Sequence, residues 1–193
     1  GLSVGCSTNA YFTEKALREL IPHIDFVNIG IKGYSDDIYR SCGVKSSKFV
    51  FRNLKLLYDS NVHVEVATVY MRGFEGEVIK TARYISSISK DIPFQVMRFI
   101  PFGEASIDLE PTIKESEMLC NELRNYLNYV YLFNSPGTEY LNTICPNCGK
   151  TVFEREFYSP MGSRVIENRL EGSCECGYKI PFEGTISDEQ FDE

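Results

Sequence analysis

Phe26-Val-Asn-Ile-Gly-Ile31 is a short apolar run between Asp25 and Lys32, and its length and composition are typical of a buried β-strand. Similar runs, rich in β-branched or aromatic residues, recur along the chain. They are Val62–Met71, Phe94–Ile100 and Tyr129–Phe133, and Leu2–Val4 is expected to be the stub of one more strand. The sequence therefore predicts five strands in the first two-thirds of the chain.

Amphipathic segments separate these runs, with apolar residues spaced as on one face of a helix. Thr13 is expected to cap the first helix, which Pro22 ends. Three more helices are expected. One begins after Ser47, one runs through Val78–Ile88, and one opens with the capping box Thr112-Ile-Lys-Glu115. Strands and helices that alternate at intervals of about 30 residues predict right-handed βαβ units on a parallel sheet. Because five strands cannot close an eight-stranded barrel, the expected fold class is α/β, with a partial (βα) barrel over residues 1–137.

The first of these strands lies so close to residue 1 that no earlier element covers that edge of the sheet. Natural proteins usually avoid an uncovered edge, since it invites pairing with another chain. We therefore expect the chain to be the later part of a longer protein, with a missing N-terminal barrel half as its partner. A homodimer through the exposed edge is the other expectation.

Two close pairs of cysteines mark the last third of the chain: Cys145-Pro-Asn-Cys148-Gly149 and Cys174-Glu-Cys176-Gly177. Four thiolates in two turns are the donor set of a tetrahedral structural zinc site, and the glycine after each pair permits a positive φ. Between the pairs, Thr151–Tyr158 and Arg164–Leu170 predict the two strands of a hairpin. Residues 138–186 are thus expected to form a zinc ribbon with a small β-hairpin, and residues 187–193 a disordered acidic tail.

Two alternatives to zinc stay open for Cys145, Cys148, Cys174 and Cys176. They are free thiols, or iron in a rubredoxin-like site, since ligand softness alone does not separate the two metals. The other three cysteines stand apart in the sequence. Cys42 and Cys120 are expected to be small buried hydrophobes, and Cys6 to pack near the end of a strand.

The composition excludes several function classes. The chain has 193 residues, 43% of them hydrophobic and 24% charged, with a net charge of −7 and a pI near 5.0. Such an acidic chain is not expected to bind nucleic acid or an anionic membrane, and no apolar run approaches the roughly 18–20 residues that span a bilayer. Seven cysteines, four of them in metal-type pairs, favour a reducing cytoplasm over a disulfide framework. His23 and His63 predict no hydrolytic triad, and the glycines form no phosphate-binding loop.

Eight stretches follow one another in a distinctive order: Ser7–Tyr11, Asp25–Gly33, Ser35–Gly43, Val62–Gly73, Arg98–Pro101, Asn134–Gly137, Asn142–Gly149 and Arg164–Leu170. In this order they resemble radical S-adenosylmethionine (SAM) proteins related to pyruvate formate-lyase activating enzyme. The likeness is greatest to the radical SAM member of the AmmeMemoRadiSam group, which ends in a similar cysteine-rich tail. The resemblance extends over most of residues 1–182.

The resemblance implies a parent protein that binds SAM and a [4Fe–4S] cluster, cleaves SAM reductively and abstracts hydrogen from a protein or small-molecule substrate. Relatives hold the cluster with a C-x-x-x-C-x-x-C loop. This sequence lacks the loop, so the chain alone is not expected to perform the chemistry. The expected function is that of the C-terminal part of a radical SAM protein resembling glycyl-radical-enzyme activating enzymes, with a structural zinc site. The alternative is a non-catalytic half-barrel and zinc ribbon that serves as an interaction scaffold.

The resemblance also suggests three cofactor-binding residues: Asn9 in a TNGY-like turn, Lys32 on a D-x-K-like strand and Arg98 on an R-F-x-P strand. Lys32 is equally well explained as a lysine at a strand end whose ammonium group reaches solvent. Arg98 is equally well explained as a buried arginine paired with a carboxylate, for which Glu65 is the expected partner.

Four departures from the family pattern lie in the matching stretches. Gly30 stands where relatives carry an acid, and Ala10 replaces the glycine of the TNGY turn. Arg72 replaces a proline, and Ile100 stands where relatives often carry histidine. The loss of the acid at residue 30 favours the scaffold alternative.

Overall fold

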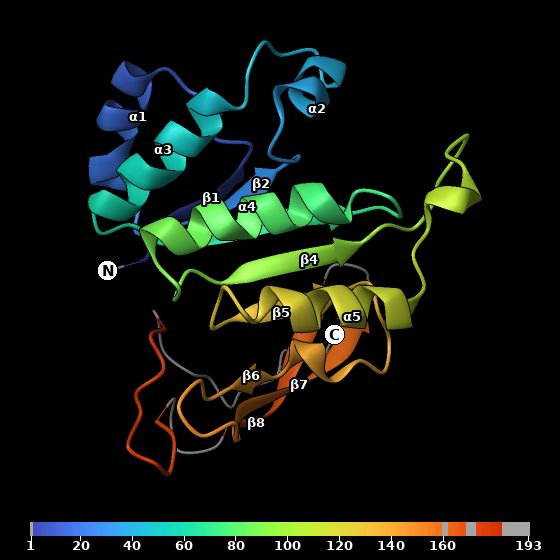
Figure 1. The fold of residues 1–193 in the computed structure, drawn as a ribbon. Coiled ribbons are helices and arrows are strands. Elements are labelled where there is room, and N and C mark those ends of the chain that lie inside the picture. Colours follow the sequence, from blue (N-terminus) through green and yellow to red (C-terminus); the bar gives the residue numbers. More distant parts are fainter. Residues whose placement is uncertain (1, 160–161, 169–172, 183–193) are drawn as a thin grey trace.

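A parallel sheet of five strands forms the first layer of the computed structural model, which describes residues 2–159, 162–168 and 173–182 (Figure 1). The strands are β1 (Gly5–Thr8), β2 (Phe26–Ile31), β3 (His63–Tyr70), β4 (Phe94–Arg98) and β5 (Val130–Phe133). They lie side by side in the order of the sequence, and each neighbouring pair is parallel. The predicted α/β class and partial-barrel arrangement are confirmed.

Helices connect the strands. They are α1 (Glu14–Leu20), α2 (Asp36–Ser41), α3 (Lys48–Asp59), α4 (Glu75–Ile88) and α5 (Ile113–Leu123), with 3-10 turns η1 (Ile21–His23), η2 (Ile107–Leu109) and η3 (Glu139–Leu141). Local signals set their ends as expected. Thr13 Oγ1 accepts a hydrogen bond from Ala16 N at 3.2 Å, and Thr112 and Glu115 form both hydrogen bonds of a capping box. Only α2 was not predicted, because it is short.

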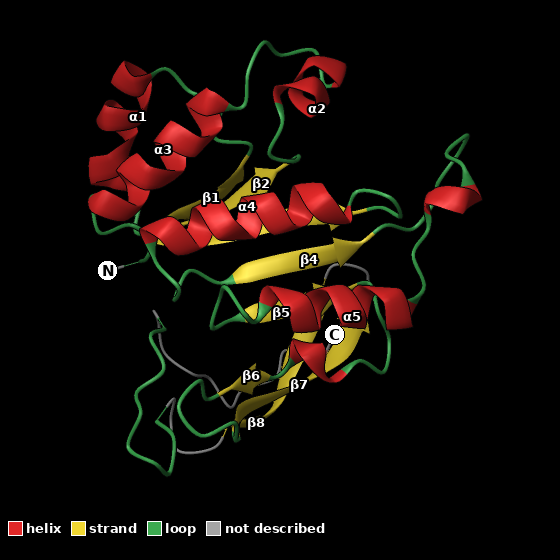
Figure 2. Cartoon of the chain, in the orientation of Figure 1, coloured by secondary structure: helices red, strands yellow, loops and turns green. Residues whose placement is uncertain are grey.

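One face of the sheet is packed against helices. Val27, Ile29 and Ile31 alternate with more exposed neighbours along β2, and they join a core with Leu17 of α1 and Leu54 of α3. Because successive strand residues point to opposite faces, this alternation separates an apolar helix-covered face from a second face. Figure 2 shows α4 lying along the sheet, just above β4 in this view.

The second face of the sheet carries polar side chains instead. Residues of intermediate exposure stand at the alternate positions, among them Asn28 on β2, Glu65 on β3, Gln95 on β4 and Tyr131 on β5. The strand register pairs Asn28 with Glu65 and Gln95 with Tyr131. We call this the open face of the sheet.

A separate antiparallel sheet follows β5. It contains β6 (Thr143–Ile144), β7 (Thr151–Ser159) and β8 (Gly162–Asn168) in that order, and Figure 2 shows it beside β5 and α5. This antiparallel unit has its own small core, made of Tyr129, Cys145, Val152, Phe153, Cys174 and Ile180. The hairpin is confirmed, and β6 is an additional strand. The turn residues Pro160 and Met161, the expected strand end at 169–170 and the tail 187–193 lie outside the described residues.

Two strands in the parallel sheet have boundaries that differ from expectation by two residues or more. The first strand is Gly5–Thr8 and not Leu2–Val4, since Leu2 is 96% exposed and Val4 pairs with Asp25 before the ladder begins. The fourth strand ends at Arg98 and not at Ile100, because Pro101 has no N–H to continue a ladder.

Within the described part of the chain, the helices are too short or too polar to cross a bilayer.

Candidate metal centre and cofactor edge

The four paired cysteines come together in one cluster. Their sulfur atoms all lie within 4.8 Å of one another, with Cys145 Sγ 3.7 Å from Cys176 Sγ and Cys148 Sγ 3.3 Å from Cys174 Sγ. Sulfurs about 2.3 Å from a central tetrahedral zinc would lie roughly 3.8 Å apart. The donor set and its spacing therefore fit a four-sulfur metal site. Cys145 and Cys174 are buried and the other two are exposed.

Two similar turns position these sulfurs. Gly149 has φ +75° and donates to Cys145 O at 2.9 Å, while Gly177 has φ +84° and donates to Cys174 O at 2.8 Å. A residue with a side chain rarely adopts such a φ, so glycine is needed at both positions. The C-x-C pair, although one residue shorter than the C-x-x-C pair, thus closes an equivalent turn. The prediction of positive φ after each pair is confirmed.

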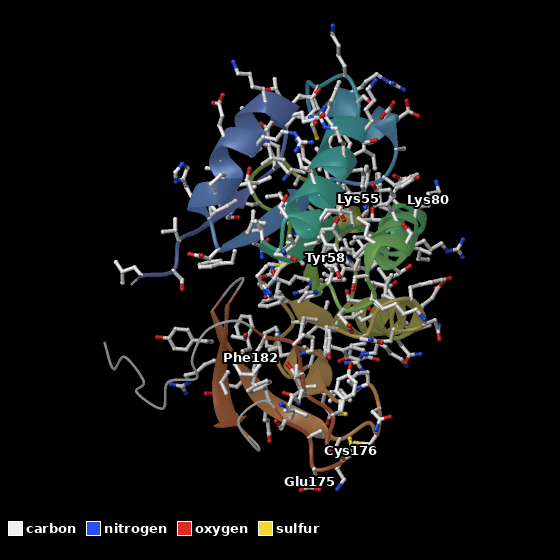
Figure 3. The ribbon with its side chains drawn as sticks, turned by 90° about the vertical axis from the view of Figure 1, so that its left-hand side faces the viewer. Lys55, Tyr58, Lys80, Glu175, Cys176 and Phe182 are labelled. Carbon is white, nitrogen blue, oxygen red and sulfur yellow. The ribbon has the colours of Figure 1, made fainter. Side chains whose placement is uncertain are left out.

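Neighbouring polar groups favour the thiolate form of Cys176 in this cluster. Asn147 Nδ2 donates to Cys176 Sγ at 3.4 Å, and this hydrogen bond, together with one from the backbone at Tyr178, lowers the pKa of the Cys176 thiol to about 6. Lys150 forms an ion pair with Glu175, which joins the two cysteine turns. Figure 3 places Glu175 and Cys176 at the end of the antiparallel unit that lies far from Lys55 on α3 and Lys80 on α4.

The remaining cysteines do not form a second metal site. Among the described residues, the four-cysteine cluster is the one group of three or more potential ligands that comes together. Cys120 is buried on α5, and burial raises the pKa of its thiol to about 12; Cys6 packs against the helix-side core. The expectation of a buried Cys42 is wrong, because this residue ends the short surface helix α2 and is exposed. These three cysteines do not provide the thiolate trio that a [4Fe–4S] cluster requires.

The three cofactor candidates lie at the carboxyl ends of their strands, which we call the carboxyl edge. Asn9 follows β1, and its Oδ1 accepts from Tyr11 N at 3.0 Å. Lys32 follows β2 with an exposed side chain, while its backbone N–H faces Tyr39 Oη at 3.4 Å. In parallel α/β sheets, ligand sites form at this edge.

Arg98 ends β4 and is paired, but not with Glu65. Its Nη1 lies 2.6 Å from Glu110 Oε1, and its Nε donates to Asn134 O at 2.9 Å. The expectation of Glu65 as the partner is wrong because the register sets Arg98 beside Tyr70, well beyond Glu65 along β3. Arg98 also shares the strand side of the buried Phe94 and Val96, whereas Glu65 belongs to the open face. With its side chain only 11% exposed, Arg98 fastens the long loop after β4 to β5.

Sequence reasoning missed the polar network on the open face. Gln95 Nε2 donates to Glu65 Oε2 at 2.6 Å, and Asn28 Nδ2 donates to Gln95 Oε1 at 2.9 Å. The available signal was a polar residue inside each of three apolar runs: Asn28, Glu65 and Gln95. It became informative only once the register had placed these residues in one row.

Comparisons with known proteins agree with this architecture. Residues 1–85 match the Radical SAM superfamily. The uncharacterized protein MJ0808 of Methanocaldococcus jannaschii is 30% identical over 181 residues, which are 90% of this chain and 52% of that protein. The chain thus spans about half the length of this curated relative.

A solved structure shares the fold at low sequence identity. A domain of pyruvate-formate lyase-activating enzyme from Bacteroides vulgatus ATCC 8482 superposes with a TM-score of 0.55 at 9% identity, covering 65% of this chain and 79% of that one. TYW1 with a lysine-pyruvate adduct bound gives a TM-score of 0.49 at 14% identity, covering 71% of this chain and 44% of that one. Residues 1–85 of the chain are thus similar to the radical SAM superfamily, and the chain shares the fold of a domain of an activating enzyme.

Proposed function

We propose that the chain contributes the later strands of the (βα) barrel of a radical SAM protein that resembles glycyl-radical-enzyme activating enzymes. The observation that carries this proposal is the superfamily match over residues 1–85, which contain both Asn9 and Lys32. Residues 1–137 would be the barrel part and residues 138–186 a unit held by a structural metal. The four sulfurs within 4.8 Å of one another support the second half of the proposal.

The carboxyl edge is the proposed place for SAM, which supplies a 5′-deoxyadenosyl radical when it is cleaved. Lys32 would place its ammonium group beside the anionic groups of SAM, and Asn9 would donate or accept hydrogen bonds there. Arg98 would act as a positioning residue, since Glu110 and Asn134 already engage its guanidinium group. The cysteines for an iron–sulfur cluster would come from the proposed N-terminal barrel half.

Calorimetric titration of SAM into the full-length, anaerobically reconstituted protein tests this proposal. Lys32→Ala should weaken SAM binding at least ten-fold, whereas Lys15→Ala, which removes an exposed lysine on α1, should leave it unchanged. Equal affinity in both variants would remove Lys32 from the site.

A non-catalytic scaffold is the second candidate function. It is favoured by Gly30, where the family acid is missing, and by the lack of a cysteine trio in this sequence. If the full-length protein has no C-x-x-x-C-x-x-C motif and shows no measurable SAM binding, the scaffold function is supported and the radical SAM function is excluded.

Zinc is the metal proposed for the four-cysteine cluster, where a closed sulfur shell would serve folding and leave no position for a reactant. Elemental analysis of protein never exposed to chelator should give about one equivalent of zinc per chain. Cys145→Ser combined with Cys148→Ser should abolish metal retention, and Cys42→Ser should not. Less than half an equivalent of any metal would overturn the site, and a full equivalent of iron would replace zinc by a rubredoxin-like centre.

A further inference from the structure

A cavity of about 460 Å³ lies between the open face of the sheet and the antiparallel unit. Glu65, Gln95, Tyr131 and Phe133 line it from the parallel strands, and Phe153 and Arg155 line it from β7. Ligand pockets for small molecules typically have volumes of roughly 300–1,000 Å³ and combine apolar walls with a few polar groups. This cavity has both properties.

The cavity is remote from the carboxyl edge. Its lining includes His63, Pro93 and Tyr129, which stand at the amino ends of β3, β4 and β5. Asn9, Lys32 and Arg98 are not part of it. Phe182, which also lines the cavity, lies nearer the parallel sheet than Cys176 does (Figure 3). The cavity is therefore a different site from both the proposed SAM site and the metal centre.

Arg155 provides a cation on one side of the cavity. Its Nη1 donates to two neutral acceptors, Thr143 Oγ1 at 2.6 Å and Leu141 O at 3.2 Å. Its guanidinium carbon lies 5.6 Å from the ring centre of Tyr131 and 5.4 Å from that of Phe153. Within the described residues, no ion pair joins Arg155 to a carboxylate, and its Nε and Nη2 make no hydrogen bond. A half-buried guanidinium with this freedom is suited to bind a carboxylate.

Glu65 provides an anion on the other side. Its Oε2 accepts from Gln95 Nε2 at 2.6 Å, and its Oε1 lies 3.5 Å from His63 Nε2. Asn28 holds Gln95 in turn, so a chain of two amides fixes the direction of the carboxylate. The side chain of Glu65 remains 36% exposed, which leaves room for a donor from a ligand.

Arg155 belongs to β7, but its guanidinium group lies beside the ring of Tyr131 on β5, which is two strands from Glu65 on β3. Adjacent strands are about 4.8 Å apart, so β3 and β5 are separated by roughly 10 Å. In a free amino acid the ammonium and carboxylate groups are attached to the same carbon atom. Such a molecule is too short to bind Glu65 and Arg155 at the same time. Two residues in extended form span about 7 Å, and a hydrogen bond at each end covers the remaining separation.

We propose that this cavity binds a zwitterion of dipeptide size with an apolar side chain. The carboxylate of the ligand binds Arg155, its ammonium group binds Glu65, and its side chain packs among Tyr131, Phe133 and Phe153. This inference rests on the cavity and its charges, and it does not depend on SAM binding at the carboxyl edge.

Titration of the metal-loaded protein with the dipeptide Ala-Phe, followed by NMR and calorimetry, tests the proposal. Ala-Phe should bind, and both its C-terminal amide and its N-acetyl derivative should bind at least ten-fold more weakly. Glu65→Gln, which keeps an acceptor for Gln95, should weaken binding of Ala-Phe but not of the N-acetyl derivative. Arg155→Gln should weaken binding of Ala-Phe but not of the amide.

Glu122→Gln, an exposed change on α5, is the matched control and should leave binding unchanged. Because Arg155 also holds Leu141 and Thr143, metal content and melting temperature are compared for each variant. The Glu65→Gln result stands even if Arg155→Gln fails to fold. Equal binding of the three probes, no binding of any of them at several millimolar, or a Glu65→Gln variant that behaves like the wild type would overturn the proposal.

Discussion

Ala10 is held in a backbone conformation that its side chain disfavours. Its φ is +53°, its side chain is fully buried, and its carbonyl accepts a hydrogen bond from Asn53 Nδ2 at 2.8 Å. Left-handed backbone costs an L-residue about 1–2 kcal/mol, a cost that the glycine of the TNGY-like turn, implied by the resemblance, would avoid. Asn53, itself completely buried on α3, offsets this strain and fixes the turn beside Asn9.

Replacement of Ala10 by a β-branched residue should therefore be severe. Ala10→Val is expected to lower the free energy of unfolding by about 2–4 kcal/mol, since overpacking of a buried site adds to the backbone strain. Ala16→Val, at an exposed position on α1, should cost less than about 1 kcal/mol. Urea unfolding of both variants measures the difference, and equal costs would show that the turn at Ala10 tolerates bulk.

Glu115 should make stability depend on pH. Hydrogen bonds from the backbone N–H of Thr112 and from Arg72 lower the pKa of its carboxyl group to about 2. Since this folded-state pKa lies below the ordinary value of 4.5, the stabilisation is complete above pH 4.5 and is lost as the pH falls towards 2.

Glu115→Gln tests this dependence. The difference in unfolding free energy between wild type and variant should be largest at pH 6 and should shrink steadily between pH 4.5 and pH 2.5. Metal release at acid pH affects both proteins, so it cancels in the difference. Glu122→Gln should show no such trend, and a constant difference for Glu115→Gln would mean that its carboxyl group titrates normally.

At the scale of elements, helices rely on their caps, whereas the antiparallel unit relies on its cysteines. Its core has few members, and two of them, Cys145 and Cys174, are themselves proposed metal ligands. A unit this small buries too little apolar surface to fold alone, so metal binding and folding should be coupled.

The double variant Cys145→Ser and Cys148→Ser should accordingly expose the antiparallel unit to proteases. Limited proteolysis followed by mass spectrometry should show cleavage after residue 138 at least ten-fold faster than in the wild type. Cys42→Ser, which changes an exposed cysteine outside the cluster, should be cleaved at the wild-type rate. Equal rates for all three proteins would mean that the unit folds without its metal.

At the scale of the whole molecule, two cores share one boundary. The larger lies between the parallel sheet and its helices, and the smaller lies within the antiparallel unit. Tyr129 belongs to the smaller core although it directly precedes β5, so the parallel sheet provides part of the support for the antiparallel unit.

Removal of the proposed metal should therefore unfold the smaller core and leave the larger one folded. With chelator, amide hydrogen exchange is expected to accelerate at least ten-fold in β6 and β7 and to stay unchanged in β2, β3 and α3. Far-ultraviolet circular dichroism should retain its helical signal, because the helices belong to the larger core. Loss of protection throughout β2 and β3 would show that the two cores unfold as one.

The sequence by itself determined the order of the five parallel strands and of the longer helices, the capping box at Thr112 and the two cysteine turns. Each of these is a local property: apolar periodicity, a cap or a glycine acts within a few residues of its own position. It also indicated the carboxyl edge, because parallel strands bring their ends together.

Only the tertiary structure decided which distant side chains meet. It paired Arg98 with Glu110 and not with Glu65, and it placed Glu65 and Arg155 on two sides of one cavity. Such pairings depend on strand register and on how the antiparallel unit lies against the sheet, since a shift of one residue would move a side chain to the opposite face. No local pattern carries that information.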